Sequence, residues 1–174
     1  MAVNVEIKAR LANAALAHRT AEKISGGPPQ ILHQTDVFFH CSDGRLKLRI
    51  FDHSSGELIL YRRTDENHIR RSDYVIAPTS SPDALLEILQ QTLKTIGTVK
   101  KSRNLYLVGQ TRIHIDQVEG LGDFLELEVV LKAGQSEVEA AQIAQELLDK
   151  FGIRADDLQS KAYMICFIHN AALE

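Results

Sequence analysis

Hydrophobic and polar residues alternate along much of the chain, and this period of two predicts β-strands with one polar face. The first alternating segment covers residues 3–11. An alanine-rich stretch at residues 11–23 follows it and predicts a helix that ends before Gly26 and Gly27. Further alternating segments lie at residues 34–40, 45–51, 57–63, 99–107, 111–116 and 124–131.

Two other segments have the leucine spacing of amphipathic helices. The first begins at residue 82 and runs to residue 93, with Gly97 expected just past its end. The second begins with a capping box formed by Ser136 and Glu139 and is expected to end at Gly152. The whole pattern predicts a single α+β domain over residues 1–174, with about eight antiparallel strands and a few helices outside the sheet.

Composition narrows the classes of function. Twenty Lys and Arg residues stand against 23 Asp and Glu residues, so the net charge of -3 does not favour binding to nucleic acid. No apolar run is long enough for a membrane helix, and the first ten residues lack the features of a signal peptide. Two cysteines without metal-ligand spacing complete a profile that predicts a cytoplasmic protein, with neither nucleic acid nor membrane as a partner.

The polar faces of the predicted strands are strongly ionic, and their charges are sorted by sign. If the sheet curls so that these faces look inward, several cations share a confined space and repel each other unless a polyanion lies between them. Arg and Lys suit phosphate oxygens, while carboxylates such as Glu126, Glu128 and Glu6 suit Mg²⁺ or Mn²⁺. The alternative without a bound ligand is that these charges lie on solvent-exposed faces or protect strand edges from aggregation.

Four segments together resemble the CYTH superfamily, also called the triphosphate tunnel metalloenzymes. They are VEIKAR at residues 5–10, KLR at residues 47–49, KSR at residues 101–103 and VEGLGDFLELE at residues 118–128. The last segment is most similar to the class IV adenylate cyclase-like branch. The resemblance runs from residue 3 to about residue 165.

The resemblance implies an eight-stranded antiparallel barrel whose tunnel grips a triphosphate and a Mg²⁺ or Mn²⁺ cofactor. It implies catalytic roles for Glu6, Lys8, Glu126 and Glu128. The metal ligands would be Glu6, Glu126 and Glu128, with Asp116 as a further candidate. The phosphate ligands would be Lys8, Arg10, Lys47, Arg49, Arg63, Lys101, Arg103, Arg112 and Lys161. Tyr163 would belong to the C-terminal segment that closes the tunnel mouth.

The sequence departs from the family pattern at two positions. Asn4 replaces the first carboxylate of the E-x-E-x-K signature, which bears on whether one or two metal ions bind. Arg62 or Arg63 replaces a lysine at the end of the fourth strand, and Arg63 is preferred because it shares the face of Tyr61.

Three functions fit these residues. A metal-dependent phosphohydrolase acting on a small triphosphate ranks first, because hydrolysis requires no adenine pocket and the sequence shows none. A class IV adenylate cyclase, which converts ATP to cyclic AMP and pyrophosphate, is the alternative. A non-catalytic module that binds polyphosphate or nucleotide is the third. Many antiparallel barrels of this kind pair into homodimers, although no patch in the sequence indicates it.

Overall fold

A computed structural model describes residues 2–63 and 70–159 of the chain. The strands are β1 (Ala2–Arg10), β2 (Gln30–Phe39), β3 (Arg45–Asp52), β4 (Ser55–Arg63), β5 (Arg70–Thr79), β6 (Thr95–Val108), β7 (Thr111–Val118) and β8 (Gly122–Val130). The helices are α1 (Ala14–Ser25), α2 (Pro82–Thr92) and α3 (Glu137–Phe151), followed by a short 3₁₀ turn at Ala155–Asp157.

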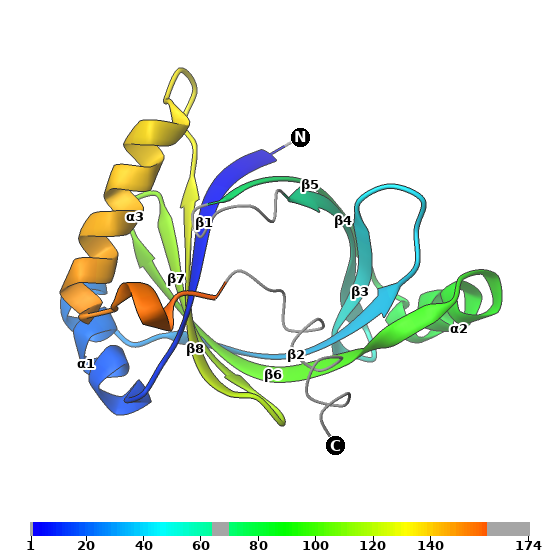
Figure 1. Ribbon diagram of the computed structural model, residues 1–174. Coiled ribbons are helices and arrows are strands. Elements are labelled where there is room, and N and C mark those ends of the chain that lie inside the picture. The colour runs from blue at the N-terminus through cyan, green and yellow to red at the C-terminus, as the bar shows by residue number, and fades with distance from the viewer. Residues whose placement is uncertain (1, 64–69, 160–174) are drawn as a thin grey trace.

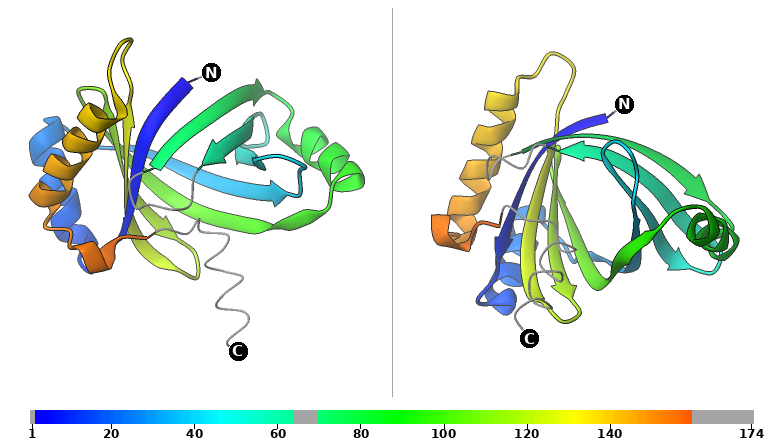
Figure 2. Two further views of the ribbon diagram at one scale, coloured as in Figure 1. Left: turned by 45° about the horizontal axis from the view of Figure 1, so that its top comes forward. Right: turned by 45° about the vertical axis from the view of Figure 1, so that its right-hand side comes forward.

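All eight strands join into one closed antiparallel barrel in the order β1-β5-β4-β3-β2-β6-β7-β8. Figure 1 looks into this barrel, with α1 and α3 packed on one outer side and α2 on the other. The turned views in Figure 2 show the same separation of the helices. The expected α+β class and eight-stranded barrel with outer helices are therefore confirmed.

The main hydrophobic core lies outside the barrel, between the sheet and two helices. Strand β8 shows why, because its side chains alternate between the two faces of the sheet. Leu125, Leu127 and Val129 are fully buried in the cluster that includes Ala140 and Ala144 of α3. The intervening side chains Glu126 and Glu128 face the barrel interior. The apolar side chains of β8 are therefore buried against the helices on the outer face.

Two smaller apolar clusters complete the packing. One joins Val37, Phe39 and Leu48 to Leu89 of α2 and so fixes that helix to β2 and β3. The other consists of Phe38, Val99, Val118 and Phe124, on inward-facing strand positions, together with Leu121 of the turn between β7 and β8. The second cluster fills one part of the barrel interior with side chains, which leaves the polar cavity in the remainder.

The structure changes three details of the expected elements. Helix α1 begins three residues later than expected, because the Asn13 side chain accepts a hydrogen bond from the backbone N–H of Leu16 at 3.0 Å and caps it. The expectation that Gly97 follows the end of the second helix was wrong, since α2 ends at Thr92 and the chain enters β6 at Thr95. Strand β5 had no assigned bounds, because its alternation is weak.

The capping box at Ser136 and Glu139 is confirmed, as is the break at Gly152, where a backbone φ of 66° ends α3. Gly44 lies in the connection between β2 and β3 and has a φ of 79°. None of the helices in the described residues is long and apolar enough to cross a membrane.

Truncation of a side chain on the outward face of the barrel should destabilise the protein more than truncation of a side chain on its inward face. Leu127→Ala removes a fully buried side chain and is expected to lower the free energy of unfolding by about 2–5 kcal/mol. Leu105→Ala truncates a partly exposed side chain on the cavity side of β6 and should cost clearly less. Urea denaturation of both variants checks this, and equal losses would contradict the assignment of the core to the outer face.

Candidate active site

The barrel encloses a cavity of about 340 Å³, a size common among small-molecule sites, and every strand contributes to its lining. Nine predicted site residues lie together in this lining: Glu6, Lys8, Lys47, Arg49, Lys101, Arg103, Arg112, Glu126 and Glu128. They come from β1, β3, β6, β7 and β8, so only closure of the barrel brings them together.

Asp36 of β2 is the counterion for three of the predicted phosphate ligands. Its oxygens lie 2.9 Å from Lys47 Nζ and 2.8 Å from Arg49 Nε, and Lys101 Nζ is 3.8 Å away. Asp36 is only 2% exposed, and burial alone would raise its pKa. The surrounding cations outweigh burial and hold the pKa of this carboxyl well below its ordinary value. Asp36 is therefore ionised inside the barrel.

A second buried ion-pair group joins β6, β7 and β8. Arg103 donates to both oxygens of Asp116 at 2.7 Å and to Glu126 Oε2 at 2.6 Å. Burial would raise the pKa of both carboxyls, but the neighbouring cations, Arg103 among them, lower it instead. Burial also lowers the pKa of Lys101, which lies 3.6 Å from Asp116, to about 7.

Arg112 forms a third group on the far side of this network. Its Nε lies 2.9 Å from Glu128 Oε2, and its Nη2 donates to the Tyr74 hydroxyl at 3.2 Å. Burial would lower the pKa of Arg112, but Glu128 and Tyr74 outweigh it and raise the pKa. Arg112 thus links a predicted metal ligand to an aromatic side chain of β5.

The cavity lining is nearly neutral within the described residues. Six Lys and Arg side chains line it, together with five carboxylates, and Asp116 adds a sixth carboxylate behind Arg103. From the sequence alone, the inward-facing cations were expected to repel each other without a bound polyanion. The structure shows that carboxylates of the same chain already compensate much of this positive charge. A bound polyanion would therefore replace some of these carboxylates as partners of the cations.

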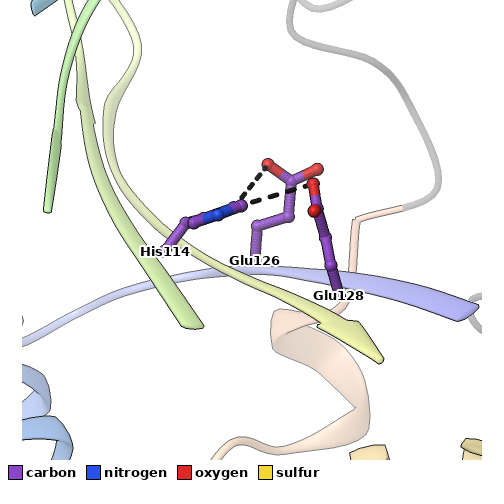
Figure 3. Close-up of side chains that lie close together, drawn as sticks. All are labelled: His114, Glu126 and Glu128. Carbon is purple, nitrogen blue, oxygen red and sulfur yellow. Dashed lines mark ion pairs between the residues drawn. The ribbon is translucent and has the colours of Figure 1, made fainter. Parts of the chain in front are cut away.

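Three ligand groups of the kind that hold metal ions converge in the cavity: His114, Glu126 and Glu128 (Figure 3). Their ligand atoms all lie within 4.8 Å of one another, and His114 Nδ1 is 3.9 Å from Glu126 and 3.7 Å from Glu128. Glu6 stands opposite Glu128 in the sheet register. The set therefore offers two to three carboxylates and an imidazole to a divalent cation.

Asn4 provides a further test of whether these residues fit a cation. Its side-chain oxygen is buried in the same cavity and has no hydrogen-bond partner in the described part of the chain. A buried acceptor without a donor is unfavourable unless a ligand or water satisfies it. An amide oxygen is a suitable ligand for a hard divalent cation, so the residues present are chemically compatible with one.

Five other predicted residues have different surroundings or lie outside the described part of the chain. Arg10 does not line the cavity; its guanidinium donates to the Leu121 carbonyl at 3.1 Å and lies 5.1 Å above the Phe124 ring. The backbone of β4 places Arg63 opposite Ser72, but the side chain of Arg63 lies outside the described residues. Lys161 and Tyr163 lie outside them altogether. Asp116 is engaged by Arg103 and Lys101 rather than placed in the His114 cluster.

Asp36 is a site residue that was not predicted from the sequence. A signal was present, because Asp36 shares its strand face with Gln34 and Phe38 and so follows the same period as the other inward residues. Only the register, which sets Asp36 opposite Arg49, shows that it neutralises the cations of the next strand.

Loss of the Asp36 charge should destabilise the protein in a pH-dependent way. Asp36→Asn leaves several buried cations without their counterion and is expected to cost about 3 kcal/mol of unfolding free energy at pH 7. Because the folded pKa is lowered, this stabilisation is complete above about pH 4 and is lost as the pH falls further.

Urea denaturation between pH 7 and pH 3 measures the difference. The exposed Asp43→Asn, which removes a surface pair with Arg62, is the control and should change stability little. Equal stability of Asp36→Asn and wild type at pH 7 would show that Asp36 is not the counterion inferred from the geometry.

Comparison with known proteins places this geometry in a family. Residues 2–163 match the CYTH domain. A Methanocaldococcus jannaschii protein, named as a candidate adenylate cyclase, is 22% identical over 169 residues, which cover 93% of this chain and 97% of that one.

Two solved structures share the fold. A Pyrococcus horikoshii protein has a TM-score of 0.83 at 23% identity and covers 92% of this chain and 97% of its own. A Hippeastrum protein, described as a candidate adenylyl cyclase with a dominant triphosphatase activity, has a TM-score of 0.68 at 16% identity and covers 96% of each chain. Since the family match extends over nearly the whole sequence and the barrel carries its charged interior, this chain belongs to the CYTH-domain family.

Proposed function

We propose that this protein is a divalent-metal-dependent triphosphatase that hydrolyses a small triphosphate inside the barrel. The observation that carries the proposal is the convergence of six Lys and Arg side chains on one cavity that also holds the His114, Glu126 and Glu128 cluster. Linear triphosphates carry several negative charges and bind divalent cations, so they match both parts of this cavity at once.

For hydrolysis, the protein mainly has to position the triphosphate and the attacking water and to stabilise the charge that develops on the phosphate oxygens. A water oxygen forms a bond to the terminal phosphorus, and the bond from that phosphorus to its bridging oxygen breaks. The bridging oxygen leaves with the electron pair on the remaining diphosphate, orthophosphate is released, and a water proton passes to solvent. Lys8, Lys101 and Arg103 would neutralise the charge that develops on the phosphate oxygens.

The carboxylates Glu126 and Glu128, with Glu6 and His114 beside them, would hold Mg²⁺ or Mn²⁺. The cation would supply Lewis-acid stabilisation of phosphate oxygens when bound. Arg103 and Arg112 are paired with the same carboxylates in the structure. Both guanidinium groups would then be available to phosphate oxygens, because Glu126 and Glu128 would bind the metal ion instead of Arg103 and Arg112.

Adenylate cyclase activity is the second candidate, and the M. jannaschii relative is named for it. In that reaction the ribose 3′ oxygen bonds to the α-phosphorus, the bond from the α-phosphorus to its bridging oxygen breaks, pyrophosphate leaves, and the hydroxyl proton passes to solvent. Triphosphatase activity ranks first because the Hippeastrum protein of the same fold is described as having mainly that activity, and because hydrolysis requires no fixed ribose.

Two substitutions inside the cavity should abolish turnover without unfolding the protein. Lys8→Ala removes a buried cation next to Glu126. Glu128→Gln removes one negative charge from the group of His114, Glu126 and Glu128 that would bind the metal ion. Each is expected to lower kcat/KM by about 100-fold or more. Orthophosphate release from ATP, tripolyphosphate and thiamine triphosphate measures this with Mg²⁺ or Mn²⁺ present.

The exposed Lys100→Ala and Glu119→Gln are matched controls and should retain full activity. Near-normal turnover by both cavity variants would refute the assignment of the site. Cyclic AMP and pyrophosphate in place of orthophosphate would select the cyclase. Binding of these compounds without turnover would leave the non-catalytic module.

Metal and triphosphate binding should also be strongly coupled, because Arg103 and Arg112 share carboxylates with the cation. Isothermal titration with non-hydrolysable imidotriphosphate is expected to give at least about tenfold tighter binding for its Mn²⁺ complex than for the metal-free form. The double variant Glu126→Gln/Glu128→Gln should lose that difference. Equally tight binding of both forms by the wild type would contradict the exchange of ion pairs.

A further inference from the structure

Asp36 differs from Glu126 and Glu128, which also neutralise cations in the cavity. The two glutamates belong to the group that would bind the metal ion, and Asp36 does not. Asp36 lies on β2, and it pairs with Lys47 and Arg49 of the neighbouring strand β3. A bound metal ion would therefore replace the cationic partners of the glutamates and leave those of Asp36 in place.

Three charge-assisted hydrogen bonds hold the two cations at Asp36. Arg49 donates from Nε to Oδ1 at 2.8 Å and from Nη2 to Oδ2 at 2.9 Å, which sets the plane of its guanidinium group. Lys47 Nζ donates to Oδ2 at 2.9 Å. Because a guanidinium group has five N–H bonds and an ammonium group three, both side chains keep N–H groups that do not contact Asp36.

A fixed orientation matters because Lys47 and Arg49 are long side chains. Each has many rotamers when it is unrestrained, and a ligand that binds such side chains must order them. Both line the cavity, and Lys47 Nζ lies 5.6 Å from the centroid of the Phe38 ring and 5.7 Å from that of Tyr61. Asp36 and these rings order the two cations before a ligand binds, which lowers the entropic cost of binding a phosphate group.

The charge of Asp36 has the opposite effect on a phosphate ligand. Although burial would raise the pKa of this carboxyl, the neighbouring cations hold it well below its ordinary value, so Asp36 is negatively charged at neutral pH. A negative charge beside a bound phosphate group repels it. Neutralisation of the cations and orientation of the cations are thus two roles with opposite effects on phosphate affinity, and a binding experiment can distinguish them.

We propose that Asp36 is a positioning residue for triphosphate binding, which orients Lys47 and Arg49 so that both bind phosphate oxygens without rearrangement. This inference rests on the proposed triphosphate site and adds a residue that acts in that site through other side chains. The contribution of Asp36 does not require the metal ion, because Asp36 lies outside the metal-binding group.

The test measures the affinity for imidotriphosphate by isothermal titration, with and without Mn²⁺, in wild type and Asp36→Asn. The cavity of Asp36→Asn is more positive, so binding would tighten if the carboxylate acted through its charge alone. A positioning role predicts instead that Asp36→Asn weakens binding about tenfold, because the ligand must then order two long side chains. Near-UV circular dichroism at the temperature of the titration checks that the variant is folded.

Two further measurements separate positioning from a general structural effect. In the background Lys47→Ala/Arg49→Ala, Asp36→Asn should no longer weaken imidotriphosphate binding, because its effect is exerted through these two cations. The ratio of the affinities for the Mn²⁺ complex and for metal-free imidotriphosphate should be the same in Asp36→Asn as in wild type, since the metal-binding glutamates are unchanged.

Asp73→Asn is the matched control. Asp73 pairs with Arg71 at 3.0 Å, on the face of β5 opposite to the cavity-lining Tyr74, so its loss should change neither affinity.

Asp36→Glu is the second variant, and it serves if Asp36→Asn does not fold. It keeps the negative charge but moves the carboxylate by one methylene group. A positioning role predicts that imidotriphosphate binding weakens by about threefold or more, whereas a role in charge neutralisation alone predicts no change.

The outcomes distinguish this inference from the function on which it rests. Unchanged or tighter binding by Asp36→Asn overturns the inference and leaves the triphosphate site standing. An equal loss of affinity in the Lys47→Ala/Arg49→Ala background also overturns it, because the effect then belongs to the fold. If wild type binds no imidotriphosphate with or without Mn²⁺, the proposed function fails as well. A loss that is present in wild type and absent without the two cations supports the inference.

Discussion

The charge balance inside the barrel is the constraint on which the rest of the structure depends. A closed sheet with Lys, Arg, Asp and Glu on its inner face cannot use that face as a hydrophobic core. The main apolar clusters therefore lie on the outer face, and α1, α2 and α3 cover them. Inside, Asp36, Asp116, Glu126 and Glu128 neutralise the cations across neighbouring strands.

This arrangement explains how the site is kept ready for a ligand. Buried ion pairs contribute little net stability, because desolvation offsets much of their attraction, but removal of one partner is costly. The network therefore holds the cations in fixed positions at small net gain in free energy. A metal-bound triphosphate can replace the internal partners of Arg103 and Arg112 without leaving charges uncompensated, so the same pairs that stabilise the empty barrel favour joint binding of metal and triphosphate.

Most of the fold could be predicted from sequence, because strict alternation identifies strands such as β8 and the capping box marks the start of α3. Strand β5 had no such signal, since its polar start and Pro78 weaken the alternation. Recognised motifs identified the cations of the site but not their partners. Asp36 becomes a counterion only through its register with Arg49, and Arg112 meets Tyr74 only because the closed barrel brings β5 and β7 to the same cavity. Such relations depend on tertiary structure and not on local pattern.

The most direct test of the proposed exchange of ion pairs is a crystal structure of the protein with imidotriphosphate and Mn²⁺, in which anomalous scattering locates the cation. We expect Mn²⁺ bound to Glu126 and Glu128 inside the barrel, with phosphate oxygens against Lys8 and Lys101 and with Arg103 and Arg112 turned from these carboxylates toward the ligand. Triphosphate bound outside the barrel, or Mn²⁺ bound away from both glutamates, would contradict it.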